Sequence, residues 1–167
     1  LAANQLSTQT QQSLEYRVKS MSEVAKVGFT DWLEAHSVAM SGFIQTMPHN
    51  DEINALEMLQ LSGKFAMTFY AQTDGTLVLA NGASVDIDPR QRPWYLEAVK
   101  EGKTICTDPY RDALTGETMV TVATPVYQNG QLTGVVGGDI SLRKVVSDLS
   151  QFNFGENAFG MLFSDSG

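Results

Sequence analysis

TMVTVATPVYQNGQLTGVVGGDIS, residues 118–141, is the stretch that predicts the centre of the fold. Its two halves are rich in β-branched and apolar residues, and they flank Asn129-Gly130, the strongest short sequence signal for a β-hairpin. A second pair of runs, FAMTFYA (65–71) and TLVLA (76–80), flanks QTDG in the same way. The sequence therefore predicts two hairpins that build an antiparallel sheet.

Helical spacing surrounds these hairpins. Apolar residues recur every three or four positions from Leu14 to Phe43, which predicts a long N-terminal helix within residues 1–48. At about 1.5 Å per residue, such a helix is longer than a small domain needs, so we expect its later half to pack on the core and its earlier half to form a dimer face. Further helices are expected after MPHN (47–50), around WYLEAVKEG (94–102) and over 142–150. Hairpins with packed helices define an α+β domain.

Composition excludes several classes of function. The 167 residues carry a net charge of -8, and a nucleic-acid-binding protein normally presents a basic face. Cys106 is the only cysteine, and the two histidines do not have the spacing of a zinc motif. We find no nucleophile with a histidine at a recognisable spacing and no glycine-rich phosphate loop, so we expect neither an enzyme nor a cofactor. No run approaches 18 apolar residues, the minimum for a transmembrane helix.

The segment between the hairpins, residues 81–117, is too long for a passive connection, because loops beyond about 12–15 residues are usually functional. It contains DPRQRPWY (88–95), which gathers two arginines and two aromatic residues in an acidic chain. A guanidinium binds carboxylates through paired charged hydrogen bonds, and an indole N–H is a pure donor. This octapeptide is therefore the first candidate for a binding site.

Three ordered motifs carry a resemblance to a known family: DPRQRPWY, DPYRDALTGE (108–117) and the TVATPVY…NG…GVVGGDISL hairpin (121–142). Together they resemble the membrane-distal module of double Cache domains, the extracytoplasmic sensors of bacterial methyl-accepting chemotaxis receptors and of some sensor kinases and diguanylate cyclases. The resemblance implies a long N-terminal helix (1–48), followed by a PAS-like (Cache) module with a central antiparallel sheet flanked by helices (49–150). Residues 151–167 would begin a truncated membrane-proximal module.

The resemblance also implies a pocket for an amino acid. Arg92 and Trp94 would hold the ligand carboxylate, and Tyr110, Asp112 and Asp139 would hold its ammonium group. Tyr95 is a further candidate contact, although a core position suits it better. The acceptor oxygens of Tyr110, Asp112 and Asp139 suit a cation such as an ammonium group. Lysine could not replace Arg92 in a bidentate contact with a carboxylate.

Other residues leave alternatives open. The family usually has an aromatic residue, typically tyrosine, where this chain has Ile87, so a different small amine or carboxylate could be the ligand. Arg90 could pair with Asp86 or Asp88 instead of a ligand. Asp139 could instead cap the helix that follows it.

The neighbourhood of the pocket can also be predicted. Gly137 and Gly138 are expected to let the strand backbone come close to a ligand. Phe69 and Tyr70 could add an aromatic wall.

We thus expect the periplasmic ligand-binding domain of a membrane-anchored bacterial chemotaxis receptor in the inner membrane. It would bind an amino acid or a related amine or carboxylate and form a homodimer through its N-terminal helix. The alternatives are the sensor domain of a histidine kinase or diguanylate cyclase, or a structural dimerisation module without a ligand.

Overall fold

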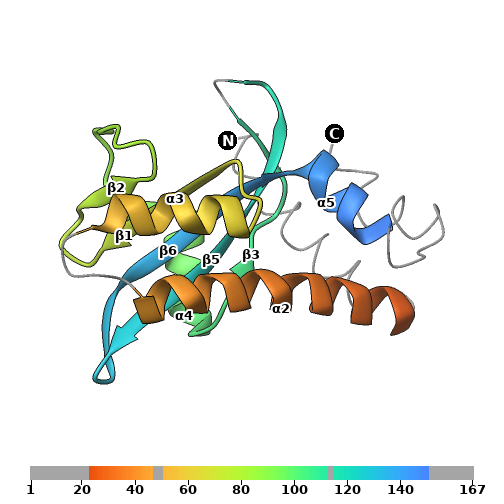
Figure 1. The fold of residues 1–167 in the computed structure, drawn as a ribbon, viewed down its shortest axis with the longest axis horizontal. Coiled ribbons are helices and arrows are strands. Elements are labelled where there is room, and N and C mark those ends of the chain that lie inside the picture. The colour runs from red at the N-terminus through yellow and green to blue at the C-terminus, as the bar shows by residue number, and fades with distance from the viewer. Residues whose placement is uncertain (1–22, 47–50, 113–114, 151–167) are drawn as a thin grey trace, which may run out of the picture. The chain divides into compact units, whose positions relative to one another are not determined.

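The computed structural model describes residues 23–46, 51–112 and 115–150 (Figure 1). The predicted hairpins and the helices near residues 94–102 and 142–150 are confirmed, whereas the first half of the N-terminal helix and the predicted second module lie outside the described residues. Two strands of two residues each were not predicted. The elements in chain order are α2 (Glu23–Thr46), α3 (Glu52–Ser62), β1 (Met67–Gln72), β2 (Leu77–Leu79), the 3-10 helix η1 (Pro89–Gln91), α4 (Pro93–Glu101), β3 (Ile105–Cys106), β4 (Tyr110–Arg111), β5 (Thr118–Gln128), β6 (Gln131–Ser141) and α5 (Leu142–Ser150).

The described chain divides into two compact units. The larger unit comprises Leu33–Thr107 and Thr121–Ile140. Of the described residues, the smaller unit comprises the start of α2 up to Trp32, those within Asp108–Val120, and residues 141–150. Arg92, Trp94, Tyr95 and Asp139 therefore belong to the larger unit.

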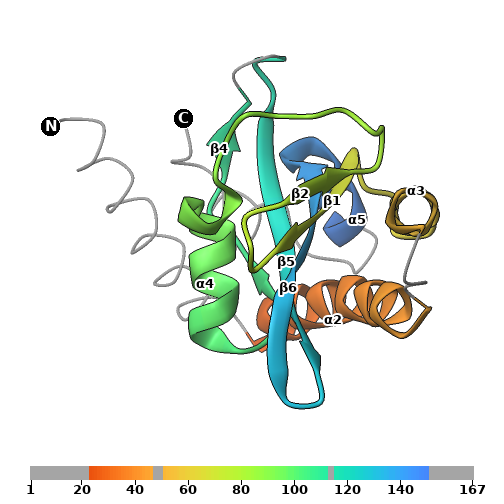
Figure 2. The same ribbon diagram turned by 90° about the vertical axis from the view of Figure 1, so that its left-hand side faces the viewer.

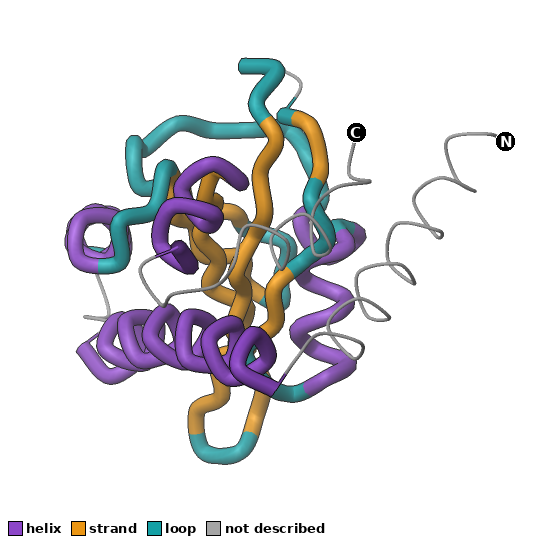
Figure 3. The backbone as a smooth tube through the Cα atoms, turned by 90° about the vertical axis from the view of Figure 1, so that its right-hand side faces the viewer, coloured by secondary structure: helices purple, strands orange, loops and turns teal. Residues whose placement is uncertain are grey.

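The larger unit is built on an antiparallel sheet with the strand order β2-β1-β6-β5-β3. The long β5–β6 hairpin ends in a short teal turn (Figure 3). Asn129 and Gly130 form this turn, and their φ angles of 53° and 79° are the positive pair that a type I′ turn requires. Asparagine and glycine tolerate this conformation best, which is why the dipeptide predicts the hairpin. In the smaller unit, β4 pairs with the first residues of β5. The α+β, PAS-like fold class is confirmed.

Helices cover both faces of this sheet (Figure 2). On one face, α4 packs over a buried cluster formed by Ala71, Tyr95, Ala98, Ile105, Ala123 and Val135. On the other face, the Phe43 ring of α2 packs edge-on against Tyr70 at 5.9 Å, and the Thr68 hydroxyl donates to the Leu56 carbonyl of α3. Because side chains alternate along a strand, Phe69 faces α4 while Tyr70 faces α2.

A chain of hydroxyl groups joins three elements of the larger unit. The Ser37 Oγ of α2 lies 2.7 Å from the Thr104 Oγ1, which follows α4, and Thr104 Oγ1 lies 2.7 Å from the Thr124 Oγ1 of β5. Thr124 in turn donates to the Met40 sulfur at 3.1 Å. Met40 is fully buried, so this polar chain ends inside the core.

Candidate functional site

Arg92 stands at the junction between η1 and α4. Its backbone is extended, with φ -77° and ψ 144°, as expected for a residue that precedes a proline. Its carbonyl accepts hydrogen bonds from the Tyr95 and Leu96 amides, which begins the helix. The residue is exposed, and no residue that the structure describes forms a hydrogen bond or ion pair with its guanidinium. An uncommitted guanidinium at the positive end of a helix is suited to a carboxylate.

Trp94, in the first turn of α4, lies against Phe69 of β1. Their ring centroids are 4.7 Å apart and the planes are inclined by 57°. Tyr70 points to the opposite face of the sheet, where it meets Phe43, so it does not share a wall with Trp94, whereas Phe69 lies beside Trp94. That Phe69 lines a ligand pocket stays a prediction.

The strand glycines have a different role from the one expected. Phe69 pairs with Gly137 across the β1–β6 ladder, and a Cβ at position 137 would overlap the Phe69 ring. A Cβ at position 138 would likewise overlap the ring of Phe65. The expectation that these glycines clear space for a ligand is wrong, because protein rings already fill the space beside them. Gly137 instead lets the Phe69 ring lie close to the sheet, where it packs against Trp94.

Asp139 lies two residues beyond Gly137 on β6. Residues two apart on a strand point to the same face, so the Asp139 side chain lies on the face of the sheet that carries Phe69, the cross-strand partner of Gly137. Asp139 is about 7 Å further along the strand than Gly137. It is half-buried, and one carboxylate oxygen accepts a 2.7 Å hydrogen bond from the Thr121 hydroxyl of β5. The α4 face of the sheet thus carries the Trp94 ring, which lies against Phe69, and the Asp139 carboxylate. Sequence reasoning did not single out Thr121, because its contact depends on the pairing of β5 with β6.

The Arg90 guanidinium forms hydrogen bonds with other residues of the protein. Its Nε and Nη2 donate to the two oxygens of Asp88 at 2.9 and 3.1 Å, which confirms one of the two predicted pairings. These hydrogen bonds lower the pKa of Asp88 and raise the pKa of Arg90. Its Nη1 donates to the Thr73 carbonyl in the β1–β2 turn at 3.2 Å. Ile87, one residue before Asp88, is exposed.

Tyr95 lies in the core beneath α4. Only 7% of its surface is exposed, and it belongs to the buried cluster described above. Burial raises the pKa of its phenol, because the charged form would lose its hydration. A ligand contact by Tyr95 stays a prediction.

Tyr110 and Asp112 belong to the smaller unit. Tyr110 is exposed on β4, opposite Met119 of β5. Asp112 accepts a 2.9 Å hydrogen bond from the Thr115 hydroxyl, and its backbone amide donates to the Glu117 carbonyl. These bonds give Asp112 a local role in shaping its turn. That both residues contact the same ligand as Arg92 stays a prediction.

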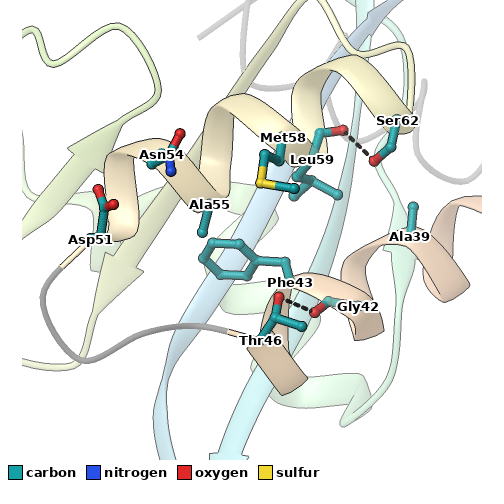
Figure 4. Close-up of a pocket in the computed structure, with 10 residues that line it drawn as sticks. All are labelled: Ala39, Gly42, Phe43, Thr46, Asp51, Asn54, Ala55, Met58, Leu59 and Ser62. Atoms are coloured by element: carbon teal, nitrogen blue, oxygen red, sulfur yellow. Dashed lines mark hydrogen bonds between the residues drawn. The ribbon is translucent and has the colours of Figure 1, made fainter.

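A groove of about 350 Å³ lies elsewhere in the larger unit, between α2 and α3 (Figure 4). These helices pack on the Tyr70 face of the sheet, whereas Arg92, Trp94 and Asp139 are associated with the α4 face. None of the predicted ligand-binding residues lines the groove, which is formed by Ala39, Gly42, Phe43, Thr46, Asp51, Asn54, Ala55, Met58, Leu59 and Ser62.

The described helices include none that is both long and apolar enough to cross a membrane. In the same ranges, no cluster of three or more histidine, cysteine, aspartate or glutamate side chains is arranged to hold a metal ion.

Comparison with known proteins gives a consistent result. Residues 29–147 match the family model described as the first PDC sensor domain of methyl-accepting chemotaxis protein-like proteins. The chain is 35% identical over 162 residues to the methyl-accepting chemotaxis protein PctB of Pseudomonas aeruginosa, an alignment that covers 93% of this chain and 26% of PctB. The chain therefore spans about a quarter of the length of this curated relative.

Solved structures with the same fold are ligand-binding domains. The domain of Pseudomonas aeruginosa PctB in complex with L-Gln superposes with a TM-score of 0.65 at 33% identity, covering 79% of this chain and 57% of that one. The domain of the Pseudomonas fluorescens chemoreceptor CtaA in complex with L-valine superposes with a TM-score of 0.63 at 26% identity, covering 89% of this chain and 67% of that one.

Proposed function

The chain belongs to the family of methyl-accepting chemotaxis protein-like first PDC sensor domains, and we propose that it binds an α-amino acid and reports it to a chemotaxis receptor. In this proposal, Arg92 and the Trp94 indole N–H hold the ligand carboxylate. Asp139 holds the ammonium group, with Tyr110 and Asp112 as further acceptors. The amino acids named with the related PctB and CtaA domains support this class of ligand.

The observation that carries the proposal is the contrast between the two arginines of DPRQRPWY. Arg90 is fully engaged with Asp88 and Thr73, while the Arg92 guanidinium has no partner among the described residues. Arg92 stands at the start of α4, two residues before Trp94, and α4 packs on the face of the sheet that carries Asp139. An α-amino acid has one carboxylate and one ammonium group, and this surface offers a cation and an anion to meet them.

The setting of the domain is part of the same proposal. We place it in the periplasm, as part of a receptor anchored in the inner membrane, with chemotaxis rather than a kinase or cyclase as the output and with no enzymatic activity of its own. A homodimer through the N-terminal helix remains a prediction, and sedimentation of the 167-residue chain at high concentration tests it: a strictly monomeric chain would contradict it.

Thermal shift measurements test the ligand assignment. The chain is heated with each of the twenty L-amino acids, including L-glutamine and L-valine, and every hit is titrated by calorimetry. A ligand at 100 times its dissociation constant should stabilise the domain by about 2.7 kcal/mol.

The variant Arg92→Ala should lose this response. Lys100→Ala is the matched control, because it removes the same charge from an exposed position in the last turn of α4. Failure of the wild-type chain to respond to any amino acid would refute the proposal, as would an Arg92→Ala protein that binds as tightly as the wild type.

A further inference from the structure

Arg90 connects the loop before α4 with the turn between β1 and β2, which is distant from it in the sequence. In addition to the paired bonds with Asp88, the Arg90 amide donates to Asp88 Oδ1 at 3.0 Å, so this carboxylate also caps η1. The third guanidinium contact, from Nη1 to the Thr73 carbonyl, reaches the turn between β1 and β2. We call this set, Asp88, Arg90 and Thr73, the loop tether.

The β1–β2 turn is shaped to receive Arg90. Gly75 has a φ of 94°, and a Cβ there would lie only 3.2 Å from Arg90 Nη2 and 3.3 Å from Cζ. The guanidinium therefore packs directly over a bare backbone. Asp74 supports the turn by accepting a 2.8 Å hydrogen bond from the Thr76 amide, which lowers the pKa of Asp74.

The tether matters because little else holds the chain that leads into Arg92. Every residue from Asn81 to Asp88 is exposed, and Pro89 is the only buried residue of η1. Arg92 follows Arg90 by two residues, and its side chain has no partner of its own among the described residues. The place of the Arg92 guanidinium is thus fixed mainly by its backbone, which is held on one side by the first hydrogen bonds of α4 and on the other by η1 and the tether.

We propose that Arg90 is a positioning residue, which fastens η1 to the β1–β2 turn so that Arg92 is preorganised for the carboxylate of the ligand. This inference rests on the proposed function, because it assigns Arg90 a role in the same site. Preorganisation lowers the entropy that binding must otherwise remove from the loop and the side chain. Lysine cannot replace Arg90, since an ammonium lacks the planar fork that engages Asp88 and Thr73 together.

Calorimetry with two pairs of probes tests the inference. The probes are L-glutamine and L-valine, together with their analogues without the α-carboxylate, 4-aminobutanamide and isobutylamine. The wild-type 167-residue chain is compared with Arg90→Ala, Arg90→Lys, Arg92→Ala and the double variant Arg90→Ala/Arg92→Ala. Gly75→Ala serves as a second perturbation, because it displaces Arg90 without removing it.

Arg90→Ala, Arg90→Lys and Gly75→Ala should each weaken binding of the amino acids about tenfold, the effect of losing the order of one side chain and its loop. Binding of the two amines should be unchanged, because they do not use Arg92. Titrated with enough ligand to measure the residual affinity of Arg92→Ala, the double variant should show no further loss relative to Arg92→Ala. The melting temperature of Arg90→Ala without ligand should fall by less than about 4 °C, because exposed ion pairs contribute little to global stability.

The results separate this inference from the proposed function. If Arg92→Ala abolishes amino-acid binding while Arg90→Ala binds as the wild type does, Arg90 has no positioning role and the proposed function stands. Equal losses for amino acids and amines in Arg90→Ala, or additive losses in the double variant, also overturn the inference. A wild-type chain that binds neither amino acid, or an Arg92→Ala chain that binds both normally, overturns the proposed function itself.

Discussion

The substitution Gly137→Ala should disturb the support beneath Trp94. A Cβ at position 137 would lie 2.7 Å from Phe69 Cζ and closer still to Phe69 Cε2. Carbon atoms in contact normally lie about 3.5–4.0 Å apart, so the Phe69 ring would have to move by about 1 Å. It cannot move freely, because the Trp94 ring packs against it at a centroid distance of 4.7 Å.

The expected cost follows from this confinement. Phe69 is only 6% exposed, and forcing an additional methyl group into a packed site typically costs about 1–3 kcal/mol of unfolding free energy. Urea denaturation measures it as a lower midpoint with an unchanged slope. Gly42→Ala is the matched control, because a Cβ there meets nothing within 4 Å and alanine favours a helix over glycine by up to about 1 kcal/mol. The control should therefore be slightly more stable than the wild type.

A double variant identifies the cause. Phe69→Leu replaces the ring with a smaller branched side chain, so Gly137→Ala should cost at least about 1 kcal/mol less in that background than alone. If Gly137→Ala is as stable as the wild type, or if the two changes are additive, then the close contact between Gly137 and Phe69 does not constrain the sheet and the reasoning is refuted.

Three other outcomes are expected. Leu56→Ala, at a fully buried position, should lower the unfolding free energy by about 2–5 kcal/mol in urea titrations, whereas Leu61→Ala, 80% exposed, should change it by less than about 0.5 kcal/mol. Burial raises the pKa of Tyr95 in the folded state. The contribution of Tyr95 to stability is therefore complete below the unfolded pKa of about 10 and is lost as the pH rises through the folded pKa. Tyr95→Phe should flatten the decline in urea midpoint between pH 8 and pH 10.5, and an unchanged decline would contradict this. Thr121→Val should weaken amino-acid binding by up to about tenfold in calorimetry, because it removes one hydrogen bond that orients the Asp139 carboxylate, and unaltered affinity would show that this hydrogen bond does not orient Asp139.

The sequence predicted the long hairpin well because two independent local signals coincide there. Asn129 and Gly130 suit a turn with two positive φ angles, and the flanking β-branched runs suit paired strands. The short strands β3 and β4 could not be predicted in this way, because two residues cannot display a period. Their pairing with β5 depends on tertiary contacts with residues beyond the next element or turn, which two residues cannot specify.

The candidate site divides along the same line. The pairing of Arg90 with Asp88 was one of two local options, since the partners are two residues apart and need no tertiary contact. The hydrogen bond from Arg90 to Thr73 and the one from Thr121 to Asp139 join separate strands and turns. A local sequence pattern therefore cannot predict them. The misreading of Gly137 has the same origin: a strand glycine signals a close neighbour, but not whether that neighbour is a ligand or a ring of the protein.

The hydroxyl chain from Ser37 to Met40 has a fixed direction. Each hydroxyl carries one proton, and Thr124 gives its proton to the Met40 sulfur, which has none to return. Thr104 must therefore donate to Thr124, and Ser37 must donate to Thr104. A reversal at the buried end would leave the proton of Thr124 or a lone pair of Met40 unmatched inside the core. The chain at the end of α4 remote from Arg92 is thus hydrogen-bonded to α2 through Thr104 and Ser37. A shift of α4 along the sheet must therefore either move α2 with it or break these hydrogen bonds.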